Sequence, residues 1–210
     1  MYQQTQHSET LNLSSEHLEM LTQGSGISEE VIEARGYWTA TDPDELASLW
    51  FAKYQCRVPA LVIPVHAASG EILFHRIRPD DPRPDAARPD RFIKYEQPAG
   101  TPVTLDVPPS ARVDLLDRSK RLWIVEGEKK ADSLVSRGEC AIALLGVWGW
   151  KRDNQILLDW EAVPTIGREL LIAFDSDVID NYQVRFARQS LAEILSRRSG
   201  SAGLRRSGRE

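Results

Sequence analysis

Short apolar segments recur in the second half of the chain, and each ends at a glycine or an acidic residue. The strands that they predict cover residues 121–125, 141–145 and 170–174. Four or five apolar residues between turn signals are typical of a strand buried on both faces, as in a parallel sheet covered by helices. The pattern therefore predicts three parallel strands inside an α/β domain.

The stretches around these strands have the spacing of amphipathic helices. One predicted helix covers residues 128–137, a second covers 155–162 with Trp160 buried, and a third covers 184–196. In the third helix, three apolar residues share the face that is expected to meet the sheet: Ala187, Leu191 and Ile194. Strands and helices alternate over residues 114–197, which we expect to form one α/β domain.

The first half of the chain has different patterns. Residues 1–57 contain short helical segments, which we expect to form a small helical cap, the last segment lying at 42–54. Residues 58–113 predict an antiparallel β region with strands at 61–65 and 71–78. Pro64 would make the first of these an edge strand. The proline-rich stretch 78–91 is expected to be an exposed loop, without helix or sheet.

The end of the printed chain has a third composition. Residues 198–210 are rich in Ser, Gly and Arg and bury too little apolar surface to order themselves, so we expect a disordered basic tail. No apolar run follows the third predicted helix. The sheet is therefore expected to lack a further strand, as in a C-terminally truncated domain, and its edge would be open to pairing with another chain.

Acidic residues directly follow two of the predicted strands. Glu126 follows the strand at 121–125, and Asp175 and Asp177 follow the strand at 170–174. Open α/β sheets bind ligands beyond the carboxyl ends of their strands, so we expect the three carboxylates to share one edge. Acidic residues also end strands simply because strands end at solvent. Three close carboxylates repel one another unless a proton or cation intervenes, however, and oxygen ligands suit Mg²⁺ or Mn²⁺.

The composition of the chain argues against several classes of protein. The chain has 210 residues, 41% of them apolar, and a formal net charge of −5, so it can form a core but does not coat nucleic acid through bulk positive charge. Residues 1–20 are polar, and no apolar stretch is long enough for a bilayer, so we expect a cytoplasmic protein with no membrane partner. Cys56 and Cys140 are isolated, which argues against structural zinc.

Five residues are candidates for binding nucleic acid or a nucleotide: Lys94, Lys129, Lys130, Gly146 and Trp148. Gly146 could admit a phosphate close to the backbone, and Trp148 could stack on a base. Lys94 could line a basic surface with Arg76. Each residue also fits an ordinary structural role, since lysines commonly face water and tryptophans commonly pack against a core.

The order of the motifs at the strand ends resembles a known domain. Val125-Glu126-Gly127, Leu145-Gly146 and Asp175-Ser176-Asp177 follow one another along the chain. This order is similar to that of the TOPRIM domain, which bacterial primases, type IA and II topoisomerases and overcoming-lysogenization-defect nucleases share. The strings Val-Glu-Gly-Glu-Lys-Lys-Ala-Asp and Leu-Gly-Val-Trp-Gly-Trp especially resemble an uncharacterised TOPRIM-like family in primase-type replication proteins of plasmids and phages.

The resemblance implies a Rossmann-type parallel sheet flanked by helices and a role in DNA replication. Glu126, Asp175 and Asp177 would be the catalytic residues and would hold Mg²⁺ or Mn²⁺, for primase-like nucleotidyl transfer or phosphodiester cleavage. Glu128 could share the work of Glu126, and Lys129 and Lys130 could approach a phosphate. The implied partners are DNA or RNA, expected to be single-stranded, and a replicative helicase or the remainder of a split or truncated replication protein.

Two other functions remain open. A TOPRIM-like domain without catalysis could bind nucleic acid or a partner protein. The segment around Asp175 and Asp177 also resembles the nucleophile motif of haloacid-dehalogenase-type phosphatases, although that motif normally opens its domain and here lies near the end of the printed sequence. The sequence has no GxxxxGK[ST] loop and no zinc module, so we do not expect primase or topoisomerase activity from this chain acting alone.

Overall fold

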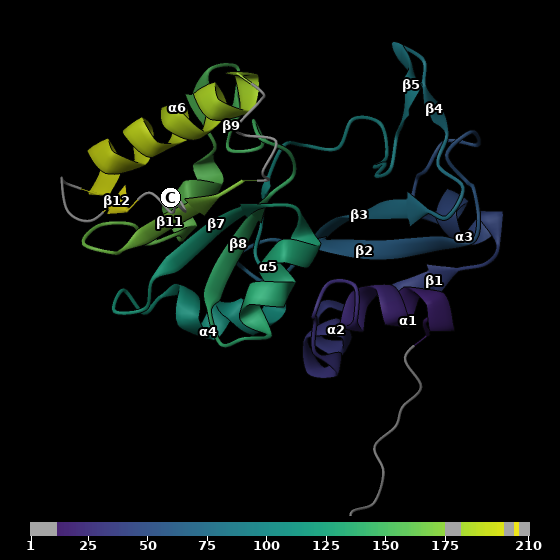
Figure 1. Ribbon diagram of the computed structural model, residues 1–210, viewed down its shortest axis with the longest axis horizontal. Coiled ribbons are helices and arrows are strands. Elements are labelled where there is room, and N and C mark those ends of the chain that lie inside the picture. Colours follow the sequence, from purple (N-terminus) through teal and green to yellow (C-terminus); the bar gives the residue numbers. More distant parts are fainter. Residues whose placement is uncertain (1–11, 175–181, 200–203, 206–210) are drawn as a thin grey trace, which may run out of the picture.

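The computed structural model describes residues 12–174, 182–199 and 204–205. Asp175 and Asp177 lie outside the described residues. Two sheets lie side by side in Figure 1: a three-stranded sheet with helices α1 and α2 near it, and a five-stranded sheet with helix α6 on one face and helix α5 on the other. No helix in the described ranges is both long and apolar enough to cross a lipid bilayer.

The five-stranded sheet confirms the predicted α/β fold class. Its strand order is β12 (Leu204–Arg205), β11 (Leu170–Ala173), β7 (Leu122–Glu126), β8 (Cys140–Leu144) and β6 (Leu105–Asp106). The first four strands run parallel, and β6 pairs antiparallel with β8. Because β7 lies between β11 and β8, the two strands that flank it end at the same edge as β7 itself.

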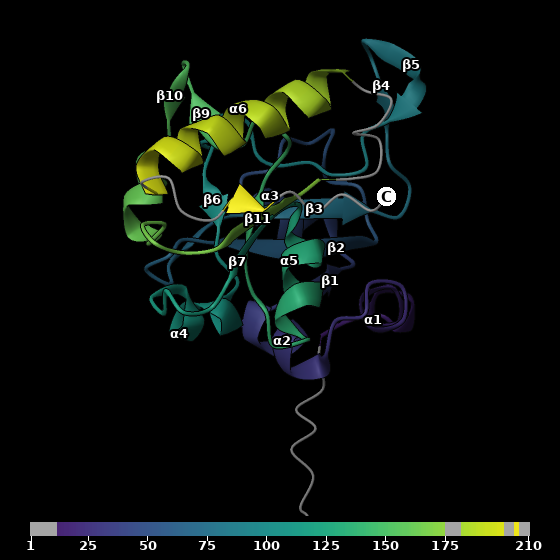
Figure 2. The same cartoon turned by 60° about the vertical axis from the view of Figure 1, so that its left-hand side comes forward.

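Strand β7 has apolar residues at consecutive positions because it is covered on both faces. Leu122 and Ile124 pack into the cluster that includes Trp160 and the α6 residues Leu191 and Leu195. The alternate residue Val125 packs on the opposite face, against α5 (Glu128–Val135). Each face thus takes every second residue of the strand. Figure 2 shows α6 and α5 on these two faces.

The three-stranded sheet has β2 (Ala60–His66) at its centre, with β1 (Trp38–Ala40) on one side and β3 (Ile72–Pro79) on the other. The prediction that Pro64 makes its strand an edge strand is therefore wrong. Strand β1 pairs only with residues 60–62, so Pro64 lies beyond its end, and the missing N–H of the proline costs no hydrogen bond to β1.

The helices of the first half are short. Helices α1 (Ser15–Thr22) and α2 (Glu29–Arg35) pack against β2, and α3 (Pro43–Ser48) follows β1. The helix expected at 42–54 ends six residues early, at Ser48, and Trp50 takes a positive φ of 69°. Asp42 caps α3, since its side chain accepts from the Asp44 N–H while Glu45 accepts from the Asp42 N–H.

Two hairpins occur where the sequence predicts a loop and a helix. Strands β4 (Pro84–Asp85) and β5 (Arg88–Phe92) form an exposed hairpin inside the stretch expected to be a loop without sheet. The helix expected at 155–162 is instead β10 (Gln155–Ile156), which pairs with β9 (Lys151–Arg152), and the 3-10 helix η2 (Leu158–Ala162). The β9–β10 turn consists of Asp153 and Asn154, both with positive φ, as a tight hairpin requires.

Regular structure continues beyond the third predicted helix at residues 197–199 and 204–205. Helix α6 (Tyr182–Ser199) contains the predicted helix at 184–196 and continues beyond it. Leu204 and Arg205 then form β12, a two-residue strand parallel to β11 that the sequence did not predict. The remaining short elements, η1 (Pro109–Ala111) and α4 (Arg112–Leu115), precede β7.

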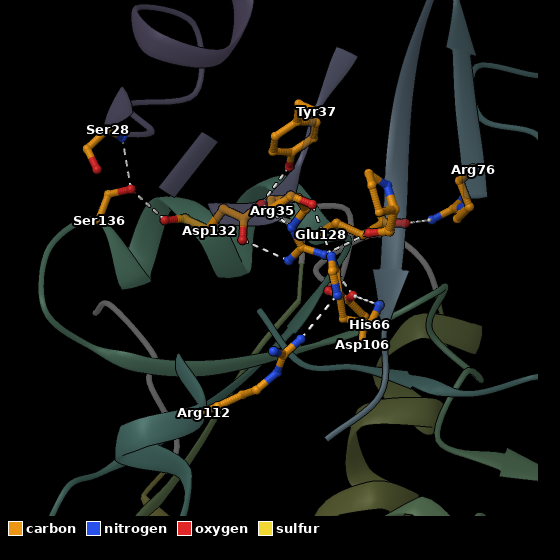
Figure 3. Close-up of polar contacts among 11 residues, drawn as sticks. Ser28, Arg35, Tyr37, His66, Arg76, Asp106, Arg112, Glu128, Asp132 and Ser136 are labelled. Atoms are coloured by element: carbon orange, nitrogen blue, oxygen red, sulfur yellow. Dashed lines mark hydrogen bonds and ion pairs between the residues drawn. The ribbon is translucent and has the colours of Figure 1, made fainter. Parts of the chain in front are cut away.

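A buried arginine ties the first half of the chain to the α/β domain (Figure 3). Arg35, at the end of α2, is 1% exposed. Its guanidinium lies 2.7 Å from Asp106 of β6 and 2.7 Å from Asp132 of α5, and it donates to the Pro64 carbonyl oxygen. One side chain therefore links α2, β2, β6 and α5, which fixes α5 relative to the three-stranded sheet.

The carboxylate of Asp132 is held by a second donor. The Tyr37 hydroxyl donates to Asp132 at 2.6 Å, and both residues are buried. Burial raises the pKa of Asp132 to about 6, although the charge of Arg35 acts in the opposite direction. Burial acts to lower the pKa of Arg35. The negative charges of Asp106 and Asp132 together act more strongly in the other direction, so the pKa of Arg35 is raised.

Candidate functional site

Glu126 is the last residue of β7 and lies at the predicted edge of the sheet. The parallel neighbour β11 is in register with it, because Ala173 pairs with Val125. Asp175 and Asp177 follow Ala173 by two and four positions but lie outside the described residues. The strands that lead to the three carboxylates are therefore adjacent and end at the same edge, while the grouping of the carboxylates themselves stays a prediction.

Gly127 allows helix α5 to begin immediately after Glu126. Its φ of 91° and ψ of 144° belong to a region that is almost restricted to glycine. The Gly127 N–H donates to the Leu144 carbonyl oxygen at 2.9 Å, which holds the turn against the end of β8. Glu128, Lys129 and Lys130 consequently lie in the first turn of α5, next to the end of β7.

A pocket of about 270 Å³ opens at this turn. Glu126, Lys129, Lys130 and Gly146 line it, together with Arg76 of β3 and Tyr95. Three cationic side chains from two distant parts of the chain thus face a pocket that two carboxylates, Glu126 and Glu128, also line. An anionic ligand such as a phosphate would find opposite charges here without needing the whole protein to be basic.

Glu128 does not resemble Glu126 in its surroundings. It is 2% exposed, and its Oε1 lies 2.8 Å from Nη1 of Arg76 (Figure 3). The Arg76 guanidinium also lies 5.3 Å from the centre of the Tyr95 ring. Glu128 lines the same pocket as Glu126 and holds Arg76 at its wall, and the expectation that it shares the work of Glu126 stays a prediction.

Burial shifts the pKa values of two side chains that line this pocket, Lys129 and Tyr95. Burial lowers the pKa of Lys129, and the nearby charge of Arg78 lowers it further, while Glu128 raises it. Burial likewise raises the pKa of the Tyr95 hydroxyl. A partly desolvated ammonium interacts more strongly with an incoming anion than one in open water. Lys129 is thus suited to contact a phosphate, as expected from the sequence.

A second pocket, of about 730 Å³, meets the first at Glu126. Glu126, Leu145 and Gly146 line both pockets, and Trp148 and Lys151 line only the larger one. Gly146 has a φ of 114°, and a Cβ added there would meet no atom within 4 Å. The backbone after β8 is therefore open to close approach, as predicted. We name these two cavities the small pocket and the large pocket.

Trp148 lines the large pocket, whereas Lys94 lies outside both pockets. Trp148 is half-buried, and the Lys151 Nζ lies 4.3 Å from the centre of its ring. Lys94 is exposed and lines neither the small nor the large pocket, although its neighbour Tyr95 lines the small one. Of the predicted binding residues, Lys129, Lys130, Gly146 and Trp148 line these pockets.

No group of three or more His, Cys, Asp or Glu side chains with metal-binding geometry occurs in the part of the chain that the structure describes. Within that part, Glu126 supplies a carboxylate to both pockets. A metal centre of the predicted composition would have to be completed by Asp175 and Asp177.

Comparison with known proteins links this geometry to one class of fold. Residues 115–205, less than half of the 210-residue chain, match a family described as "Domain of unknown function (DUF3854)". This range contains the whole predicted motif series, from Glu126 to Asp177. A search of curated proteins finds no match.

Several solved structures with the same fold are catalytic cores of DnaG-type primases. A structure described as the DnaG catalytic core has a TM-score of 0.62 and 17% identity, and the match covers 97% of this chain and 68% of that one. The zinc-binding and RNA polymerase domains of Aquifex aeolicus primase have a TM-score of 0.61 and 17% identity, with coverage of 89% and 48%. This chain thus spans about half of the Aquifex structure.

A third similar structure is described as the DnaG primase catalytic domain bound to ssDNA. It has a TM-score of 0.57 and 16% identity, and the match covers 92% of this chain and 65% of that one. The coverage of this chain shows that the three-stranded sheet belongs to the shared fold as well as the α/β domain. At these identities the similarity establishes the fold and not the activity.

Proposed function

We propose that this chain is a TOPRIM-like module of a primase-type replication protein, of the kind carried by plasmids and phages, that catalyses Mg²⁺-dependent nucleotidyl transfer on a single-stranded template. The observation that carries the proposal is the position of Glu126. It ends a central parallel strand, lines two pockets, and adjoins the strand that leads to Asp175 and Asp177. The fold shared with primase catalytic cores supports this choice among phosphoryl-transfer reactions.

The donor set fits a hard divalent cation. Glu126 offers carboxylate oxygens at a pocket, and Asp175 and Asp177 would add two more carboxylates from the neighbouring strand end. Oxygen-only ligands and a place for a substrate phosphate are what Mg²⁺ prefers. When bound, the cation would neutralise phosphate charge during the reaction.

The residues of the small pocket have complementary roles in this proposal. Arg76, held by Glu128, and the ammonium groups of Lys129 and Lys130 would bind the phosphates of a nucleotide. Gly146 would let the nucleotide approach the backbone. Lys94 would contact the nucleic-acid strand from outside the pocket. A helicase, or the remainder of a longer replication protein, would supply what this chain does not contain.

The proposal is tested first by metal binding, because the chain spans only about half of one similar primase structure. Mn²⁺ binding can be followed by electron paramagnetic resonance, since the signal of free Mn²⁺ falls as the ion binds. We expect the parent chain to bind Mn²⁺, and the Asp175→Asn/Asp177→Asn and Glu126→Gln variants to bind it at least tenfold more weakly, because even the loss of a second-shell partner of a metal ligand costs about 10–100-fold in affinity. Glu71→Gln, at an exposed carboxylate between β2 and β3, is the matched control.

Primer extension provides the second readout. With Mn²⁺, ribonucleotides and a primed single-stranded template, which removes the need for a zinc module or helicase to start a strand, the parent chain should extend the primer and the double aspartate variant should not. Equal Mn²⁺ binding by the parent and the variants would refute the proposed site. If the parent binds both metal and template but forms no product, the chain is a binding module and the catalytic part of the proposal fails.

A further inference from the structure

Two aromatic residues on helix α6 are largely exposed to solvent. Tyr182 is 69% exposed and Phe186 is 51% exposed. They lie four residues apart, on one side of the helix. The core-facing side of α6 is formed by other residues, Ala187, Leu191 and Leu195, which are fully buried. Packing of α6 onto the sheet therefore does not explain why these two aromatic rings are present.

The two rings continue a row that begins inside the large pocket. The Tyr182 and Phe186 rings are stacked, with centroids 6.2 Å apart and planes inclined by 13°. The Phe186 ring is 6.0 Å from that of Trp148, which also lies 6.1 Å from the ring of the buried Trp150 and 4.3 Å from the ammonium of Lys151. We call Trp148, Phe186 and Tyr182 the aromatic row. It begins at a partly buried tryptophan and becomes more exposed along α6.

The aromatic row lies beside cations and leads to Glu126. Trp148, Lys151 and Val184 line the large pocket together with Arg88 of β5, and the same pocket reaches Glu126. Exposed aromatic rings next to cations form the usual surface for single-stranded nucleic acid, because every base has a face that can stack and every linkage carries a charge. A protein partner would gain less from the cations, which an apolar interface has to desolvate.

We propose that the exposed rings of Tyr182 and Phe186 stack on bases of a single-stranded nucleic acid, that Lys151 contacts its phosphates, and that the strand continues through the large pocket toward Glu126. Trp148 anchors the row and is covered by Lys151, so the two α6 residues provide the stacking area. The inference rests on the proposed function for the identity of the strand as a template, and it adds a binding surface that catalysis does not require.

The test measures binding of a fluorescein-labelled oligothymidylate by anisotropy, with EDTA present so that metal binding plays no part. The Tyr182→Leu/Phe186→Leu variant should bind roughly fivefold to 150-fold more weakly, the range for the loss of one base stack. Tyr54→Leu is the matched control. Tyr54 is 61% exposed and lies 5.1 Å from the Arg83 guanidinium, but it lines neither pocket. Its loss should leave binding unchanged.

A second ligand separates stacking from charge. An abasic strand of equal length keeps the phosphates and lacks the bases, so the double leucine variant should bind it as the parent does. Lys151→Gln should weaken binding of both strands and reduce the salt dependence by about one phosphate contact. A Tyr182→Trp/Phe186→Tyr variant, which keeps two rings, should bind like the parent and excludes misfolding as the cause of the loss.

Three results would overturn the inference: unchanged oligothymidylate binding by the double leucine variant, an equal loss for the abasic strand, or an equal loss in Tyr54→Leu. These results are independent of the proposed function. Failure of the aromatic row would leave Mn²⁺ binding at Glu126 intact, whereas failure of the metal site would leave EDTA-insensitive strand binding intact.

Discussion

Replacing Arg35 by methionine should destabilise the protein strongly. Arg35 is 1% exposed and is the cation that lies 2.7 Å from both Asp106 and Asp132. Methionine fills a similar volume without a charge, so the main consequence is that two buried carboxylates lose their counterion. The Pro64 carbonyl oxygen loses a donor as well.

The expected loss follows from the cost of an uncompensated buried charge. Breaking a buried ion pair by removing one partner costs about 3–5 kcal/mol. The two pairs share one cation, and the carboxyl group of Asp132 can take up a proton because its pKa is already about 6. The costs therefore do not add, and we expect a total of about 3–5 kcal/mol, a large share of the 5–15 kcal/mol typical of a domain.

Urea unfolding at neutral pH, followed by tryptophan fluorescence, measures this loss. An Arg35→Met/Asp106→Asn/Asp132→Asn variant serves as the control, since it removes the carboxylate charges with the cation and should recover most of the stability. A loss below about 1 kcal/mol for Arg35→Met, a value typical of surface substitutions, would refute the reasoning. So would a triple variant that is no more stable than the single one.

Three further predictions concern the same region. The raised pKa of Asp132 means that the folded chain binds a proton at this carboxyl group more tightly than the unfolded chain does. This difference stabilises the folded chain by about 3 kcal/mol below about pH 4, and the stabilisation is lost as the pH rises to about 6. Asp132→Asn should therefore remove this part of the pH dependence of urea unfolding. Gly127→Ala should cost about 1–3 kcal/mol through backbone strain alone, because no atom lies within 4 Å of the added Cβ. Glu128→Gln should lower the free energy of unfolding by about 3 kcal/mol, because it breaks the ion pair with Arg76. Glu126→Gln, at a half-buried strand end, should change the free energy of unfolding by less than about 1 kcal/mol.

Each of these predictions has an outcome that contradicts it. An unchanged pH profile in Asp132→Asn would show that this carboxyl group is not the one that titrates. A neutral Gly127→Ala would mean that the turn adopts an ordinary conformation. Equal losses for Glu126→Gln and Glu128→Gln would contradict the different surroundings assigned to the two acids, of which only Glu128 is almost fully buried.

The parallel sheet could be predicted because burial on both faces leaves a direct trace in the sequence. In β7, the successive residues from Leu122 to Val125 enter two different clusters in turn, so all four are apolar. Apolar residues at helical spacing likewise predicted Ala187 and Leu191 on the buried face of α6, where Leu195 is fully buried and the predicted Ile194 is only partly buried. The exposed pair of Tyr182 and Phe186 has that spacing too, and this signal was present in the sequence but overlooked.

Elements that depend on turn geometry or on distant partners were harder to predict. Ile156, Leu157 and Trp160 have the spacing of a helix, but the left-handed conformation of Asp153 and Asn154 sets up a hairpin first. An Asp-Asn pair at a tight turn is a signal that outweighs short-range periodicity. The predicted helix at 155–162 failed for this local reason.

In the candidate site, too, some features could be predicted from local patterns and others depend on residues distant in the sequence. The nearness of Glu126 and Gly146 follows from the ends of two parallel strands and could be predicted. The burial of Glu128 could not, because it depends on Arg76, which lies 52 positions earlier on β3. The link through Arg35 likewise joins residues 71 and 97 positions apart, which no local pattern encodes.

The central claim is that Glu126, Asp175 and Asp177 hold one metal centre, and anomalous diffraction from a Mn²⁺-soaked crystal tests it most directly. We predict an anomalous peak at the edge where β7 and β11 end, with carboxylate oxygens of Glu126 and of at least one of the two aspartates about 2 Å from the ion, as for other small hard cations. A peak bound elsewhere, or Glu126 and the aspartate pair on opposite sides of the sheet edge, would contradict the claim.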